Sequence, residues 1–226
     1  MILSPGTHRL AALENAAGEA SDVRRRLPGA LLYATANATE QHVKQLHAPS
    51  LLHIVGHGVV RGSGECGTVP CVSTSMDSST AAMSLAAIVL EEAYGRTSGS
   101  DDDGMLTAIE LQNMDLRGTE LLALSQCQMA NGLTSVGEGV YGMRRAAAIA
   151  GVHTIVAPLW NVDDRVQRQL INRFYQGLAA GDARADALRR AKLLVRRSPH
   201  TRSFLYWAPV ILSGAPGPLP ASLFHP

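Results

Sequence analysis

Aromatic residues, cysteines and net charge are all scarce in this chain of 226 residues. Phe, Trp and Tyr make up only 4% of the sequence, which leaves little material for the enclosed apolar pocket of an enzyme that acts on small molecules. A formal charge of +1 gives no reason to expect nucleic acid or an anionic membrane as the main partner. No apolar run approaches the roughly 18 residues that cross a bilayer, and the N-terminus lacks the pattern of a signal peptide.

The three cysteines, Cys66, Cys71 and Cys127, are an odd number at unpatterned spacing. This argues against a disulfide framework and for a reducing compartment. Cys66 and Cys71 have no matching second pair of ligands, so we expect neither zinc nor another metal, and no cofactor. The glycines around Cys66 are not followed by the Lys-Ser/Thr pair of a phosphate-binding loop. We therefore expect a soluble cytoplasmic protein.

Segments with the patterns of strands and helices alternate along the chain. The predicted strands are apolar runs at 30–36, 51–58, 120–127, 153–160 and 207–214, with a short strand or turn at the start of 105–118. The predicted helices lie at 10–27, 37–48, 81–95, 140–152, 163–181 and 184–197, and Thr39 is the expected N-cap of the second. This order predicts an α/β fold with a mostly parallel sheet covered by helices on both faces.

Two of these strand ends carry residues with catalytic chemistry. LLHIVGHG (51–58) ends in His57 and Gly58, and ELLALSQC (120–127) ends in Cys127. Because a parallel sheet gathers the C-terminal ends of its strands along one edge, the imidazole and the thiol can face each other there. An adjacent imidazole accepts the thiol proton or stabilises the thiolate. The backbone N–H groups of Gly58 and Cys127 can then form an oxyanion hole.

Each of these residues also has a structural interpretation. A cysteine at a strand end is more often a packing residue than a nucleophile, and a lone histidine is more often hydrogen-bonded within the core. We expect His53 to be buried or to face a helix, with a secondary role in orienting the site. Cys66 and Cys71 are expected to take no part in catalysis. Spacing alone leaves both interpretations of Cys127 open.

Four blocks of sequence follow one another in a recognisable order. They are LLHIVGHG, then DGMLTAIELQNMDLRGTELLALSQC, then GEGVYGMRRAAAIAGVHTIVAPLWNVDD, and finally the closing segments FYQGLAAG, ALRRAK and YWAPVILSG. At these intervals they resemble the CHAT domains, caspase-like cysteine peptidases of bacteria that are related to separase. The resemblance implies the caspase-hemoglobinase fold.

The resemblance places the family's catalytic histidine on His57 and its nucleophile on Cys127, and so favours the catalytic interpretation. The sequence departs from the family after the cysteine, where an acidic residue and then Thr-Gly are common but residues 128–132 read QMANG. Because this loop borders the substrate cleft, substrate preference can differ. We expect one CHAT domain over 1–226, standing as a fragment or as one domain of a longer chain with a fused sensor or helical-repeat region.

Asp163 and Asp164 follow the strand that ends near Trp160. The resemblance to separase-like enzymes implies that an acidic residue here receives a basic P1 side chain, and Asp164 aligns best by its distance from Trp160. The alternative is that one aspartate caps the helix expected from Arg165, a contribution of about 1 kcal/mol. Gln126, directly before the nucleophile, is a further candidate for contacting substrate.

Three functions fit these residues. The first is a cysteine endopeptidase in which His57 is the base and Cys127 forms a thioacyl intermediate with a protein substrate, under the control of a regulatory partner or ligand. For this function, the resemblance to CHAT domains implies a role in bacterial immunity or programmed cell death. The second is an inactive caspase-like interaction or assembly module, which the intact His-Gly and Ser-x-Cys boxes disfavour. The third is a hydrolase of small esters or amides, which the scarcity of aromatic residues disfavours.

Overall fold

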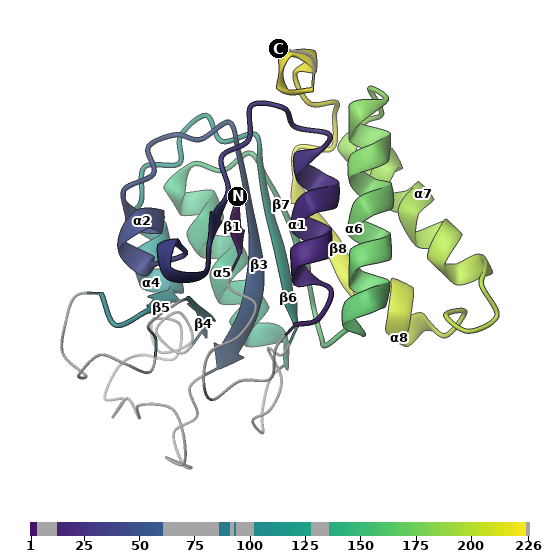
Figure 1. Ribbon diagram of the computed structural model, residues 1–226, viewed down its shortest axis with the longest axis horizontal. Helices are drawn as coiled ribbons and strands as arrows, with labels where there is room; N and C mark the ends of the chain where they lie inside the picture. Colours follow the sequence, from purple (N-terminus) through teal and green to yellow (C-terminus); the bar gives the residue numbers. More distant parts are fainter. Residues whose placement is uncertain (4–12, 61–85, 91–92, 94–101, 128–135, 225–226) are drawn as a thin grey trace.

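An eight-stranded sheet forms the centre of the protein (Figure 1). The computed structural model describes residues 1–3, 13–60, 86–90, 93, 102–127 and 136–224, without the side chains of residues 60, 126, 127 and 136–141. The strands are β1 (Ile2–Leu3), β2 (Tyr33–Ala34), β3 (Leu51–Val60), β4 (Ala86–Val89), β5 (Met105–Thr107), β6 (Leu121–Cys127), β7 (Thr154–Pro158) and β8 (Val210–Gly214). The helices are α1 (Ala16–Arg24), α2 (Glu40–Lys44), α4 (Ala108–Gln112), α5 (Val136–Ala150), α6 (Asp164–Ala179), α7 (Arg184–Arg197) and α8 (Phe204–Trp207), with 3-10 turns η1 (Thr35–Asn37) and η2 (Ala221–Leu223).

The strand order is β2-β1-β3-β6-β7-β8, and the first five of these strands run parallel to one another. β8 closes one end of the sheet antiparallel to β7. β4 and β5 form an antiparallel extension that pairs with the last residues of β3. The expected mostly parallel sheet with helices on both faces is therefore confirmed.

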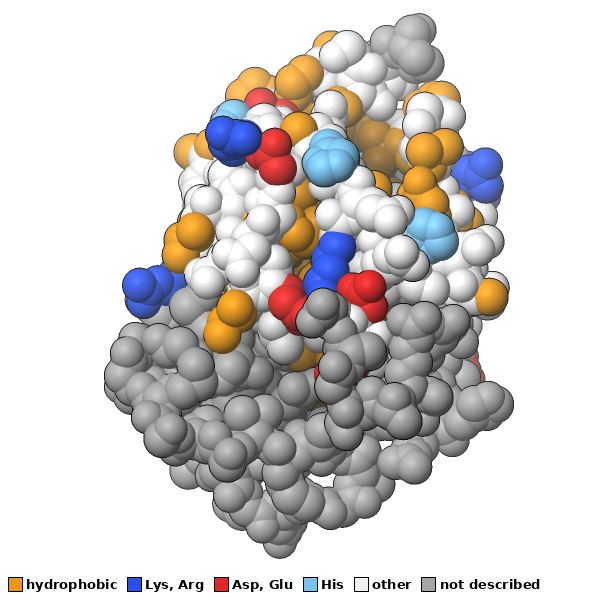
Figure 2. All heavy atoms as spheres, turned by 90° about the vertical axis from the view of Figure 1, so that its left-hand side faces the viewer, with side chains coloured by type: hydrophobic (Ala, Val, Ile, Leu, Met, Phe, Trp, Pro, Cys, Tyr) orange, Lys and Arg blue, Asp and Glu red, His pale blue; other side chains and the backbone are white. Residues whose placement is uncertain are grey.

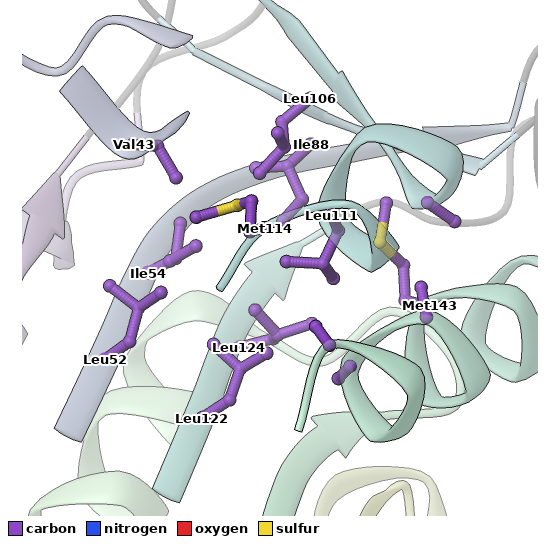
Figure 3. Close-up of a cluster of buried hydrophobic side chains, with 14 of the residues drawn as sticks. Val43, Leu52, Ile54, Ile88, Leu106, Leu111, Met114, Leu122, Leu124 and Met143 are labelled. Carbon is purple, nitrogen blue, oxygen red and sulfur yellow. The ribbon is translucent and has the colours of Figure 1, made fainter. Parts of the chain in front are cut away.

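β6 lies in the middle of the sheet and is buried on both faces. Leu122 and Leu124 pack into a core shared with α2, α4 and α5, which we call the α5-side core (Figure 3). Leu121 and Ala123 point the other way, into a core shared with α6 and α7, the α6-side core. Because successive side chains of a strand alternate between faces, a continuous apolar run is what a doubly covered strand requires.

Local sequence signals begin and end several helices. The Thr39 side chain accepts a hydrogen bond from the His42 N–H, which confirms it as the N-cap of α2. Thr107 and Glu110 form a reciprocal capping box at the start of α4. Gly151, at a φ of +102°, ends α5 in a conformation that residues with a Cβ rarely adopt. No described helix has both the length and the apolar character needed to cross a bilayer.

Two expectations need correction around β3. The helix expected over 81–95 is wrong in its centre, because residues 86–89 form β4 and pair with β3. The strand expected over 51–58 is two residues too short, because β3 continues past Gly58 to Val60. The small residues of 86–89 suit a helix as well as a strand, and the deciding factor is the partner that the β3 extension offers. Away from β3, the helix expected over 10–27 also differs, because α1 begins at Ala16 and residues 13–15 are not helical.

Candidate active site at the C-terminal ends of β3 and β6

The C-terminal ends of β3 and β6 lie side by side in the middle of the sheet. The two strands pair in parallel from Leu51 opposite Leu121 to His57 opposite Cys127. Parallel neighbours are about 4.8 Å apart across their hydrogen bonds. The backbone thus brings the position of the predicted base next to the position of the predicted nucleophile, although the two lie far apart in the sequence.

His57 lies where β3 changes partners. On one side its register partner is Cys127 of β6, and on the other it is Val89 of β4. The imidazole is 2% exposed. Gly58 continues the antiparallel pairing opposite Ile88, and the described pairing of β3 with β6 extends as far as His57.

Several predicted site features fall outside the described part of the chain. For Gln126 and Cys127 the structure describes the backbone alone. The 128–132 loop, Cys66 and Cys71 all lie outside the described residues. The proximity of His57 and Cys127 is therefore given by the register of their two strands.

His53 is a buried structural histidine on the same strand as His57. Its Nδ1 lies 2.9 Å from the Tyr175 hydroxyl of α6, and its Nε2 lies 3.0 Å from Glu19 Oε1 of α1. All three side chains are almost completely buried. Burial, together with the negative charge of Glu19, raises the pKa of Tyr175 well above its usual value. The network connects β3 to the two helices that cover this face, as expected for a buried or helix-facing residue.

The two aspartates at the start of α6 have different contacts. Asp163 is the N-cap, and its side chain accepts a hydrogen bond from the Val166 N–H at 3.1 Å. The alternative interpretation therefore holds for Asp163, on a helix that begins at Asp164 rather than Arg165. Asp164 Oδ2 accepts hydrogen bonds from the backbone N–H and the side-chain amide of Asn15, at 2.7 and 3.2 Å. Both aspartates follow β7, whose C-terminal end shares the sheet edge with His57.

One family model covers nearly the whole arrangement. The model of the CHAT domain matches residues 5–215. The chain belongs to the CHAT-domain family. The comparison with curated proteins gives no match. CHAT domains are related to caspase-like cysteine peptidases, and the mixed, mostly parallel sheet with helices on both sides is the caspase-like α/β fold.

A cluster of charges that no sequence motif indicated lies beside β5 of this CHAT domain. Lys44 Nζ lies 2.6 Å from Glu40 Oε1, 2.8 Å from Glu110 Oε1 and 3.1 Å from Asp102 Oδ1. The second carboxylate oxygen of Glu40 accepts the Gly104 N–H at 2.8 Å. On the face that carries α2 and α4, acidic and basic side chains lie next to one another (Figure 2). Only the Glu40–Lys44 spacing is visible in the sequence, as a pair four residues apart on a helix.

Burial and charge oppose each other within this cluster. Burial raises the pKa of Glu40 to about 7, even though the Lys44 ammonium and the Gly104 N–H act to lower it. Burial also acts to raise the pKa of Glu110, but hydrogen bonds from Lys44 and Thr107 outweigh it and bring that pKa below its usual value. The pKa of Lys44 is raised because its carboxylate partners outweigh burial.

β7 brings an aromatic residue to the same edge of the sheet. Trp160 follows β7, and its indole N–H donates to the Leu205 carbonyl oxygen at 3.1 Å. Its ring meets that of Phe204 edge to face, with centroids 6.3 Å apart. Phe204 and Leu205 of α8 are 59% and 53% exposed, so α8 presents an apolar surface next to this edge.

Among the described residues, no group of His, Cys, Asp or Glu side chains is arranged to hold a metal ion.

Proposed function

We propose that this CHAT domain is a cysteine endopeptidase in which Cys127 is the nucleophile and His57 the base. The observation that carries the proposal is the register of β3 and β6, in which these two residues are partners at the C-terminal end of a parallel pair. Membership of a family related to caspase-like peptidases supports the same assignment. A protein substrate fits better than a small molecule, because aromatic residues make up only 4% of the sequence and leave little material for an enclosed apolar pocket.

In the proposed reaction the Cys127 thiol gives its proton to His57, and the sulfur attacks the scissile carbonyl carbon. The backbone N–H groups of Gly58 and Cys127 donate to the oxyanion that forms. The C–N bond breaks as His57 returns the proton to the leaving amine, leaving a thioester on Cys127. Water, deprotonated by His57, then hydrolyses the thioester and restores the thiol.

The S1 subsite is proposed to contain Asp164, Asp163 or Gln126. Asp164 is the first choice, because Asp163 already serves as the N-cap of α6. A carboxylate in this position pairs with a cationic P1 side chain, and Arg is favoured over Lys because its planar guanidinium makes two parallel bonds. The Asn15 contacts of Asp164 keep its carboxylate in place beside the sheet edge.

We also propose that a regulatory partner or ligand controls the peptidase activity. The proposed role of this activity is in bacterial immunity or programmed cell death. One CHAT domain over 1–226, fused to a sensor or helical-repeat region in a longer chain, is the arrangement we propose for such control. The alternative function is an inactive caspase-like module that serves in assembly. Chemical reactivity of Cys127 separates the two functions even when the activating signal is absent.

The test is labelling by a peptidyl acyloxymethyl ketone, read by intact mass and peptide mapping. Wild-type protein should gain one label on Cys127, and Cys127→Ala should gain none. His57→Ala should slow labelling by at least about a hundredfold, the usual range for a general base. Cys66→Ala and Cys71→Ala are matched controls that should label at the wild-type rate. Equal labelling rates in wild-type protein and His57→Ala would reject the dyad and favour the assembly module.

A further inference from the structure

Positive charge is concentrated at the C-terminal end of the chain. Residues 187–226 contain six of the 20 lysines and arginines and none of the 19 aspartates and glutamates. The chain as a whole has a formal charge of only +1, so the remainder is net acidic. A charge asymmetry of this kind indicates a surface that attracts a partner of opposite charge.

Most of these cations lie on one side of α7. Residues three, four and seven apart share a helix face, which places Arg189, Arg190, Arg196 and Arg197 together. All four are exposed. α7 lies beside α6 at the outside of the molecule (Figure 1), and the exposure of the four arginines shows that their side of the helix faces solvent. We call the four arginines, with Leu193 and Leu194 between them, the α7 basic face.

Few carboxylates neutralise the α7 basic face. Arg190 pairs with Asp182, and Arg189 approaches Asp186 at 3.9 Å. Within the described chain, no carboxylate comes within ion-pair distance of Arg196 or Arg197. This differs from the face that carries α2 and α4, where cations and carboxylates are neighbours (Figure 2). The last two turns of α7 therefore present uncompensated positive charge.

Apolar and aromatic groups accompany the arginines. Leu194 is 44% exposed and Leu193 is half-buried. The Arg196 guanidinium carbon lies 5.6 Å from the centre of the Trp207 ring. Arginines around an exposed leucine and next to tryptophan resemble the composition of protein–protein interfaces, where Arg and aromatic residues are enriched.

We propose that the α7 basic face is a docking surface for an acidic protein segment that carries apolar side chains. The arginines favour a partner that carries carboxylates. Leu193 and Leu194 favour a partner that also carries an apolar side chain between those carboxylates. The i, i+7 pairs Arg189–Arg196 and Arg190–Arg197 are about 10.5 Å apart along the axis. A partner helix with carboxylates seven residues apart and leucine between them matches this spacing.

Two other anionic partners fit less well. A nucleic-acid backbone uses cations but gains nothing from exposed Leu194, which lies one turn from both Arg190 and Arg197. A lipid surface needs an amphipathic helix whose apolar side is free to insert. The apolar side of α7, including Leu188 and Val195, is buried in the α6-side core.

The test uses a synthetic acidic helix of about 14 residues, the length of α7 at 1.5 Å per residue, with glutamates seven positions apart flanking leucines. Trp160→Phe leaves Trp207 as the one tryptophan, since the chain has two, and its fluorescence reports binding beside Arg196. In this background the double variant Arg196→Glu/Arg197→Glu should lower the affinity for the peptide on the order of tenfold or more, as expected for charge pairs at an interface. Arg117→Glu/Arg173→Glu carries the same charge change elsewhere and should leave the affinity within about twofold, because long-range effects are screened.

Peptide variants and other polyanions decide the class of partner. Replacing the glutamates by glutamine should abolish binding, and replacing the leucines by serine should weaken it on the order of tenfold, as expected for apolar anchors. Absence of peptide binding, or equal loss in both double variants, would overturn the proposal. Tighter binding of single-stranded RNA or of phosphatidylserine vesicles than of the peptide, lost in Arg196→Glu/Arg197→Glu, would reassign the surface to that partner.

Discussion

Two histidines of β3 differ in what surrounds them. His53 has a partner for each ring nitrogen, Tyr175 and Glu19, and these partners hold it between α1 and α6. His57, four residues along the same strand, lies at the boundary between two pairing partners, with Cys127 beside it in register. A histidine whose two nitrogens are both engaged in the core cannot also serve as a base at the sheet edge. The structural role therefore belongs to His53, and our catalytic proposal to His57.

The carboxylates bound to Lys44 give opposite pH dependences of stability. The pKa of Glu40 is raised to about 7, so its contribution to stability is full below pH 4.5 and is lost as the pH rises through 7. The pKa of Glu110 is lowered, so its contribution is present above pH 4.5 and is lost as the pH falls through its folded value. Both carboxylates have the same ordinary pKa of 4.5, so the difference lies in their surroundings.

Glu40→Gln and Glu110→Gln should therefore change the pH profile of the unfolding free energy in different windows. Relative to Glu40→Gln, the wild-type protein should lose stability between pH 4.5 and 7, because Glu40 ionises there in the unfolded chain while burial keeps it protonated in the folded protein. Relative to Glu110→Gln, it should gain stability as the pH rises toward 4.5. Urea denaturation from pH 3 to 8 measures both differences. Parallel profiles for the two variants would contradict the assignment.

At the scale of elements, the 86–89 segment shows how a partner decides secondary structure. Ala86, Ala87, Ile88 and Val89 are all buried, and they pair with the β3 extension on one side and with β5 on the other. Ile88 enters the α5-side core while Ala87 and Val89 face the opposite side, with Val59 and Met105. The two-residue alternation is thus satisfied on both faces. The β3 extension places His57 between Val89 of β4 and Cys127 of β6, and Gly58 opposite Ile88 of β4.

The N-terminus of α6 gives a prediction that separates capping from substrate binding. Asp163→Ala should cost about 1 kcal/mol of stability and affect all substrates equally, because it removes the N-cap. If Asp164 forms S1, Asp164→Asn should cost an Arg peptide on the order of 3 kcal/mol in kcat/KM and a Leu peptide much less. Kinetics on paired Arg and Leu peptides, with melting curves, measure these effects.

Asn15→Ala is the matched control for Asp164. It removes the side-chain contact that fixes the Asp164 carboxylate but keeps the carboxylate itself. Its effect on the Arg peptide should therefore be small beside that of Asp164→Asn. Equal losses of Asp164→Asn on Arg and Leu peptides would discard the S1 assignment and leave the dyad untouched.

At the scale of the whole molecule, two cores share one sheet. Leu122 lies in the α5-side core and Phe174 in the α6-side core, and both are fully buried. β6 contributes side chains to both cores, so loss of packing on one face removes support from the other. This sharing is the physical basis for expecting one cooperative domain over 1–226.

Leu122→Ala and Phe174→Ala should each destabilise the protein, by about 2–5 and 3–5 kcal/mol respectively, through lost packing and a residual cavity. Both variants should unfold in a single transition whose midpoint is the same by circular dichroism and by tryptophan fluorescence. Leu194→Ala, at an exposed leucine, is the control and should change stability by less than about 0.5 kcal/mol. Separate transitions for the two probes would indicate two domains.

Local sequence determined the elements whose signals are local. The apolar run of β6, the helical periodicity of α6 and α7, and the caps at Thr39 and Thr107 follow from side-chain chemistry within a few residues. Four ordered blocks were also sufficient to indicate the family. Those features placed His57 and Cys127 on two strands of a mostly parallel sheet.

The tertiary structure decided what depends on distant partners. It paired His57 with Cys127 in register, turned residues 86–89 into a strand, and brought Glu19 and Tyr175 to His53. It also surrounded Lys44 with Asp102 and Glu110, which no helical spacing relates to it. The reason is that strand pairing and the burial of charge depend on which segments meet in space, and the periodicity of a single segment does not contain that information.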